Sequence, residues 1–137
     1  ATAPVVDPFR EPACRWCPGN RGLEYGTARG AGVSAVAAGR VTFAGVVAGV
    51  RYVVVGHADG RRVTYGNLAV SALREGDAVV RGSRIGSAAG PFHLGVRDGD
   101  RYVDPAELIG TWRGVVRLVP TDGSPAPPAP PPRLVCT

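Results

Sequence analysis

The chain has 137 residues, of which 20 are Gly and 13 are Pro, while 45% are apolar and 7% aromatic. This length suits one domain with a packed core and excludes two domains of ordinary size. The net charge is +5, yet all 16 basic residues are Arg and only Arg61 and Arg62 are adjacent, so no nucleic-acid partner is expected, whereas an anionic wall polymer or a membrane surface is compatible with the charge.

The N-terminal end of the chain is rich in proline. Residues 1–18 contain Pro4, Pro8, Pro12 and Pro18, which predicts an extended, irregular N-terminal strip. The first residues are small and include no initiator Met, as expected of a processed export product or a trimmed chain.

Short strands separated by turns are predicted between residues 31 and 104. Four runs rich in β-branched or aromatic residues end at Gly or at the turn pair Asp59-Gly60, and they cover residues 33–38, 40–47, 51–56 and 61–68. Two shorter strands follow, bounded by the turn segments 75–77 and 81–83, and then a hairpin of residues 92–97 and 101–103. The dense apolar run 52–55 predicts a central strand.

A single helical turn is predicted at residues 104–110, where Asp104 is the N-cap, Pro105 takes the first position and Gly110 ends the turn. Residues 115–119 predict a further edge strand, and residues 124–132 predict a polyproline-like spacer or surface strip. No apolar run approaches the ~20 residues of a membrane span. These patterns predict one compact all-β domain of antiparallel strands, either a sandwich or an open barrel, with extended Pro-rich ends.

Three cysteines lie near the ends of the chain, at Cys14, Cys17 and Cys136. We expect one disulfide, formed in an oxidising compartment. Three pairings are possible: Cys14 with Cys17, Cys14 with Cys136, or Cys17 with Cys136. Each of them leaves one free thiol. The Pro-flanked segment lacks the strand-to-helix context of a thioredoxin-like motif, and a structural zinc site would require four well-spaced ligands.

Seven short segments of the middle region carry recognisable motifs. Their common order and spacing is a more specific signal of a protein family than any one of the motifs alone. They are residues 19–25, 30–41, 55–57, 63–68, 76–79, 82–86, and 90–97 with 103–105. Together they resemble the LytM-type peptidoglycan endopeptidase domain of the M23 metallopeptidase family. The resemblance divides the chain into the N-terminal strip (1–18), a LytM-like domain (19–110), and an edge strand with a Pro-rich tail (111–137). It implies a central antiparallel sheet lining a groove, in which zinc hydrolyses peptide cross-links of the bacterial cell wall.

The family's site residues carry over only in part. The His and Asp ligands of its first motif fall on Asn20 and Glu24, and its last His ligand falls on His93. Its two catalytic histidines fall on Asn67 and Pro91. One ligand is therefore kept, one replaced and one lost, and no catalytic residue is retained.

The resemblance thus predicts a degenerate domain that leans away from being an enzyme and holds no zinc. The expected groove residues are Asn20, Glu24, Tyr65, Asn67 and His93. His93 would bond to Asn20 or Glu24, and the two asparagine amides would bond to each other across the groove.

The expected role of this degenerate domain is to bind peptidoglycan or to regulate a cell-wall hydrolase or the division machinery. The protein is expected to be secreted or in the cell envelope, monomeric, and close to the membrane surface. The alternative is an active zinc metallopeptidase that cleaves peptidoglycan cross-links with an altered set of ligands.

Overall fold

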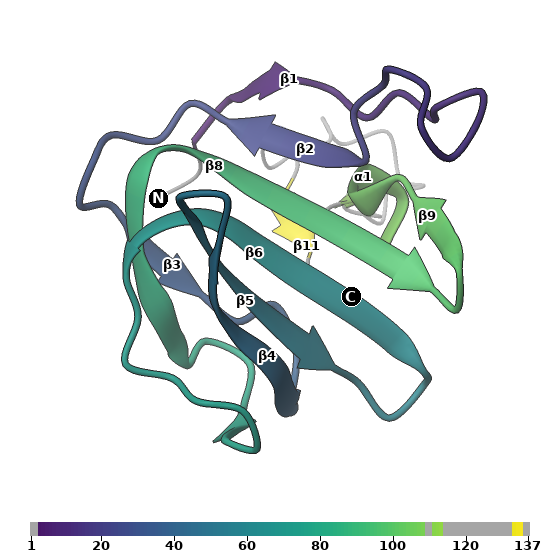
Figure 1. The fold of residues 1–137 in the computed structure, drawn as a ribbon. Coiled ribbons are helices and arrows are strands. Elements are labelled where there is room, and N and C mark those ends of the chain that lie inside the picture. The colour runs from purple at the N-terminus through teal and green to yellow at the C-terminus, as the bar shows by residue number, and fades with distance from the viewer. Residues whose placement is uncertain (1–2, 109–110, 114–132, 136–137) are drawn as a thin grey trace, which may run out of the picture.

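The computed structural model describes residues 3–108, 111–113 and 133–135, which are almost entirely β-structure (Figure 1). Nine strands form one sheet in the order β1-β2-β8-β6-β5-β4-β7, with β3 and β9 also paired to β8, and every pairing is antiparallel. The sheet strands are β1 (Val5–Asp7), β2 (Gly22–Tyr25), β3 (Gly32–Ser34), β4 (Gly39–Val47), β5 (Val50–Gly56), β6 (Arg61–Val70), β7 (Ala78–Val79), β8 (Arg84–Asp98) and β9 (Arg101–Val103).

Two further strands, β10 (Thr111–Arg113) and β11 (Arg133–Val135), pair with each other. The edge strand expected at 115–119, the polyproline segment 124–132 and Cys136 lie outside the described residues.

One antiparallel sheet is the architecture that the family resemblance implied, and of the two forms expected from the strand and turn patterns it excludes the two-sheet sandwich. The physical reason lies in β6 and β8, whose pairing shifts register between Gly66 and Leu68 and again between Leu68 and Val70. Such bulges bend strands and increase their twist. β8 can therefore pair with β3 near its beginning and with β2 and β9 further along, so that one sheet curls around its own apolar face (Figure 1).

The core lies between residues 33 and 96 and draws its side chains from β3 to β8 and the segments between them. Val53 and Val55 of β5 are fully buried, which confirms the interior strand predicted from the dense apolar run. The hairpin between β4 and β5 turns on Ala48 and Gly49, both at positive φ, as a tight two-residue turn between twisted strands requires.

Two segments differ from expectation. The N-terminal strip is not wholly irregular, because β1 adds to the edge of the sheet beside β2. Residues 84–98 form one strand of 15 residues rather than two separate strands. Pro91 is tolerated inside this strand because it lies where the pairing with β6 is interrupted, between the Gly66–His93 and Leu68–Ala88 pairs, so its missing N–H removes no bond of that ladder.

The start of the expected helical turn is confirmed as α1 (Pro105–Leu108), where the Ala106 amide donates to the Asp104 carboxylate at 2.9 Å. Its predicted end at Gly110 lies outside the described residues. Within the described part of the chain, no helix has the length and apolar character needed to cross a membrane.

Candidate functional site

Glu24 and His93 face each other on the neighbouring strands β2 and β8, in direct register. Nδ1 of His93 hydrogen-bonds to a carboxylate oxygen of Glu24, and because an ionised carboxylate only accepts, the imidazole donates from Nδ1. The two side chains are 24% and 28% exposed. The structure therefore selects Glu24, and not Asn20, as the partner of His93.

Glycines around His93 leave room for its ring. Gly22 and Gly95 are paired across β2 and β8, and a Cβ on Gly22 would lie 2.7 Å from Cε1 of His93. Gly66 lies opposite His93 on β6, where a Cβ would meet the ring of Tyr52 at 2.9 Å. The imidazole and the Tyr52 ring thus occupy space that side chains on these strands would otherwise fill.

Asn20 has a structural role that the sequence did not reveal. Its side chain is buried, and its Nδ2 donates to the backbone oxygens of Asp7 and Pro8 at 3.2 and 3.1 Å, while its Oδ1 accepts from the Gly22 amide at 3.3 Å. Asn20 also forms a backbone bridge with Arg10. The prediction that it lines the groove is wrong, because its amide is committed to holding the N-terminal strip.

The two positions of the family's catalytic histidines, Asn67 and Pro91, are bonded to each other. Nδ2 of Asn67 donates to the backbone oxygen of Pro91 at 2.6 Å, and Asn67 adopts a left-handed backbone conformation with φ 59° at the interruption between β6 and β8. The expected bond between Asn67 and Asn20 is not formed, because each amide is used elsewhere. An amide and a proline carbonyl do not titrate, so this pair offers no general acid or base.

Tyr65 was also predicted to line the groove, and this prediction is wrong. Its side chain is fully buried, its hydroxyl accepts the Val36 amide at 3.0 Å, and its ring packs on Phe92 with centroids 6.2 Å apart. Successive side chains of a strand point to opposite faces, so the neighbour Thr64 faces the groove instead. An aromatic side chain that does line the groove is Tyr52, on the adjacent strand β5.

The groove itself is a cavity of about 420 Å³ that contains Glu24, Asn67 and His93 from the predicted set. Sequence reasoning missed the other lining residues, among them Arg21, Arg97 and Tyr102. The two guanidinium groups lie over the Tyr102 ring, at 5.6 and 5.1 Å from its centroid. Arg97 and Tyr102 are cross-strand partners in the β8–β9 hairpin, so pairing the predicted hairpin residue by residue could have found them.

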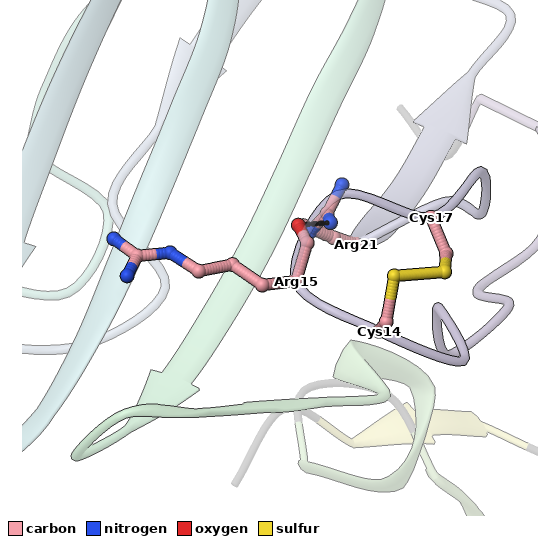
Figure 2. The surroundings of a disulfide bond; sticks show 4 residues. All are labelled: Cys14, Arg15, Cys17 and Arg21. Carbon is pink, nitrogen blue, oxygen red and sulfur yellow. Dashed lines mark hydrogen bonds between the residues drawn. A yellow bond between two sulfur atoms is a disulfide. The ribbon is translucent and has the colours of Figure 1, made fainter.

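The cysteine pairing is Cys14 with Cys17, with Cα atoms 4.9 Å apart, which removes both alternatives that involved Cys136. The pair lies in the segment from Arg10 to Asn20, closed by the backbone bridge between those residues, which we call the disulfide loop. Figure 2 shows that Arg21 holds this loop: its Nη2 donates to the backbone oxygen of Arg15 at 2.6 Å.

The donor set does not fit a catalytic zinc centre, which requires three protein ligands and an open position. Of the three ligand positions, Glu24 and His93 carry suitable groups but bond to each other, and the neutral amide of Asn20 points to the strip. Within residues 3–108, 111–113 and 133–135, no three His, Cys, Asp or Glu side chains gather as a metal site would require.

The family model for peptidase family M23 matches residues 18–105. The chain is 32% identical over 118 residues to the uncharacterized protein Rv2891 of Mycobacterium tuberculosis, an alignment that covers 77% of this chain and 47% of that protein. The chain thus spans about half the length of the curated relatives it matches.

Solved structures agree with the fold. Csd3 of Helicobacter pylori superposes with a TM-score of 0.69 at 26% identity, covering 78% of this chain and 31% of Csd3. A chain of the SpoIIIAH and SpoIIQ complex superposes with a TM-score of 0.68 at 21% identity, covering 77% of this chain and 92% of that one, and shows likeness of fold alone.

Proposed function

The chain belongs to peptidase family M23, and from this premise we propose that it acts in the bacterial cell envelope by binding peptidoglycan rather than by cutting it. The proposal rests on the contacts made by the residues at the positions of the family's ligands and catalytic histidines. Asn20 holds the N-terminal strip, Asn67 bonds to Pro91, and His93 bonds to Glu24. The two asparagines are neutral amides bonded to backbone oxygens, so neither can move a proton, and Glu24 with His93 supplies only two of the three ligands that a catalytic zinc requires.

The groove supports binding because it remains open although Asn67 and His93 are hydrogen-bonded within the chain. Its cavity of about 420 Å³ lies within the usual range for ligand sites, ~300–1,000 Å³. Arg21 and Arg97 are fixed against Tyr102, and such guanidinium groups recognise carboxylates by paired hydrogen bonds. The peptides of the wall polymer carry carboxylates, which makes these two arginines the proposed contacts.

Extracytoplasmic localisation belongs to the same proposal. Disulfides persist in oxidising environments, and the bond in the N-terminal strip joins the exposed Cys14 to the half-buried Cys17. Its presence in protein isolated directly from cells, trapped with an alkylating agent, would support export, and two free thiols would count against it.

Sedimentation with purified peptidoglycan tests the binding proposal. We expect the protein to pellet with intact sacculi, and we expect a variant with both Arg21→Ala and Arg97→Ala to stay largely in the supernatant. Arg62→Ala is the matched control, because Arg62 is exposed outside the groove. Absence of the wild-type protein from the pellet, or equal loss in the control, would refute the proposal.

Action through a protein partner is a second proposed role, and one chain of similar fold was solved within such an assembly, the complex of SpoIIIAH and SpoIIQ. The chain could act through a protein partner, of which a wall hydrolase or a division protein is the proposed class. Purified chain should then change the rate at which such a hydrolase solubilises sacculi, and no effect on any hydrolase that co-purifies with it would exclude this role.

An active zinc peptidase is the alternative function. It requires about one zinc per chain by elemental analysis, together with cleavage of cross-linked muropeptides that His93→Ala abolishes. That pair of results would overturn the proposal of binding without hydrolysis.

A further inference from the structure

A second cleft lies next to the groove, between the disulfide loop and the β8–β9 hairpin. Its volume of about 1210 Å³ exceeds the ~300–1,000 Å³ of sites for single small ligands. Arg21, Arg97 and Tyr102 line both the cleft and the groove, so the two hollows are continuous. A ligand that fills the cleft is therefore larger than one small molecule and extends toward the groove.

The side of the cleft formed by the disulfide loop is held in a defined shape. The disulfide closes the turn at its tip, the backbone bridge between Arg10 and Asn20 closes its base, and Arg21 bonds to the backbone of Arg15 in between. Figure 2 shows the Arg15 side chain extended away from the disulfide, while Arg21 lies beside the loop.

This loop exposes a tryptophan. Trp16 is 85% exposed, the most exposed of the large apolar side chains in the described part of the chain, and it lines the cleft. The Arg15 guanidinium lies over the ring at 5.0 Å from its centroid, which covers one face. An indole held by a constrained loop with its remaining surface in water is a binding platform, since burying so large an apolar surface is favourable.

The charges around the cleft indicate a neutral ligand. Four arginines line it, but so do three carboxylates, Glu11, Asp98 and Asp100. A polyanion would be repelled by those carboxylates, and a polycation by the arginines. Both walls carry carboxylate and guanidinium groups, which suits a ligand rich in hydroxyl and amide groups that both donates and accepts hydrogen bonds.

We infer that this cleft binds a neutral glycan strand, with a sugar ring stacked on Trp16 and its polar groups bonded to Asp98, Asp100 and the arginines. Sugar rings combine an apolar face of C–H groups with hydroxyls at the rim, which matches an indole surrounded by planar charged groups. The inference deepens the proposed function and rests on it: the glycan strand would occupy the cleft while its attached peptide enters the groove.

A soluble hexamer of N-acetylglucosamine is the probe, because it is neutral and carries no peptide. Titration calorimetry should detect binding by the wild-type chain, and Trp16→Ala should weaken it about tenfold, the loss expected from one aromatic stacking contact. Trp16→Phe should retain most of the affinity. Phe43→Ala is the matched control, since Phe43 is an exposed aromatic side chain on β4, outside the cleft.

The outcomes separate this inference from the proposed function. If sacculi sediment with the protein but the hexamer does not bind, or binds equally to Trp16→Ala, the glycan cleft is refuted and the proposed function stands. If the hexamer binds through Trp16 but sacculi do not bind, the cleft stands and the proposed function is refuted.

The disulfide provides an independent test. A variant with Cys14→Ser and Cys17→Ser should bind the hexamer several-fold more weakly, because Trp16 loses its fixed position. The comparison is made at a temperature at which circular dichroism shows both proteins folded. Unchanged affinity in the folded double variant would refute the role assigned to the loop.

Discussion

At the scale of single residues, Asn20 connects the N-terminal strip to the sheet. Its one amide group donates to two backbone oxygens of the strip, those of Asp7 and Pro8. A partly buried oxygen that is left without its hydrogen-bond donor lowers the free energy of unfolding by about 1–3 kcal/mol. Asn20 therefore stabilises the protein through these two hydrogen bonds and through the one that its Oδ1 accepts from the Gly22 amide.

We predict that Asn20→Ala lowers the free energy of unfolding by about 1–3 kcal/mol and loosens the strip. Urea unfolding measures the first effect, and the rate of proteolytic cleavage within residues 3–18 measures the second. A variant with unchanged stability and unchanged cleavage would show that the strip is held by other contacts.

Tyr65 gives a prediction for alkaline pH. Burial raises the pKa of its hydroxyl from 10.0 to about 12, and the hydrogen bond from the Val36 amide lowers it in part. Between pH 10 and 12 the unfolded chain therefore releases this proton while the folded chain keeps it. This pKa difference contributes up to about 3 kcal/mol to the free energy of unfolding. The contribution is fully present below pH 10 and is lost as the pH rises from 10 to 12.

The measurement is urea unfolding of the wild type and Tyr65→Phe on both sides of that window. The Phe variant starts less stable, because the Val36 amide loses its acceptor, but it should lose less stability on going to alkaline pH. Parallel losses in the two proteins would contradict a buried, protonated Tyr65.

At the scale of elements, the pairing of β2 with β8 determines the site, because it places Glu24 opposite His93 and Gly22 opposite Gly95. The close packing here leaves no room at Gly22, where an added Cβ would lie 2.3 Å from the Leu94 oxygen. Gly32 on β3 is surrounded by open space. The two glycines thus form a matched pair on strands of the same sheet.

We predict that Gly22→Ala destabilises the protein by about 1–3 kcal/mol, as overpacking does, and shifts the His93 ring signals in NMR spectra. Gly32→Ala should change stability by no more than about 0.5 kcal/mol and leave those signals in place. Equal effects of the two substitutions would contradict the packing around His93.

The outer edge of β4 is a second feature at this scale. β7 pairs with β4 only at Gly39 and Arg40, and no other strand among the described residues continues that edge. The free part of the strand exposes Phe43, Val46 and Val47. Apolar edge strands favour pairing between chains.

We predict that Val46→Lys lowers concentration-dependent association, measured by light scattering, while changing stability by no more than about 0.5 kcal/mol. Val80→Lys is the matched control, because Val80 is 65% exposed and lies outside the strands. If both substitutions lower association equally, the charge and not the strand edge is responsible.

At the scale of the whole molecule, the buried core cluster contains no residue of the N-terminal strip. Every residue of the core cluster lies between positions 33 and 96. The strip contributes β1, the disulfide loop and the contacts to Asn20, all at one edge of the sheet. The boundary at residue 19 stays a prediction, since these contacts do not test whether the domain folds alone.

We predict that a chain beginning at Gly19 still unfolds cooperatively, at a lower temperature than the full chain, because it keeps the core but loses the β1–β2 pairing. Calorimetry measures the transition. Loss of the cooperative transition would show that the strip is part of the folding unit.

The local sequence was sufficient for most of the β-structure. Turn pairs such as Asp59-Gly60 and short runs rich in β-branched or aromatic residues act over a few residues, so the strands β4, β5 and β6 and the turn α1 were predicted close to their observed bounds. The order of short motifs predicted the family and its central sheet, and the positions of Glu24, Asn67 and His93 around a groove.

Contacts between distant segments decided the rest. Only the register of β5 against β6 and of β6 against β8 turns Tyr65 to the core and leaves Tyr52 in the groove. The commitment of Asn20 to the strip depends on how the strip packs on the sheet. A one-residue change of register reverses which face a side chain occupies. The sequence by itself therefore determined which elements form, and tertiary structure decided which faces they present.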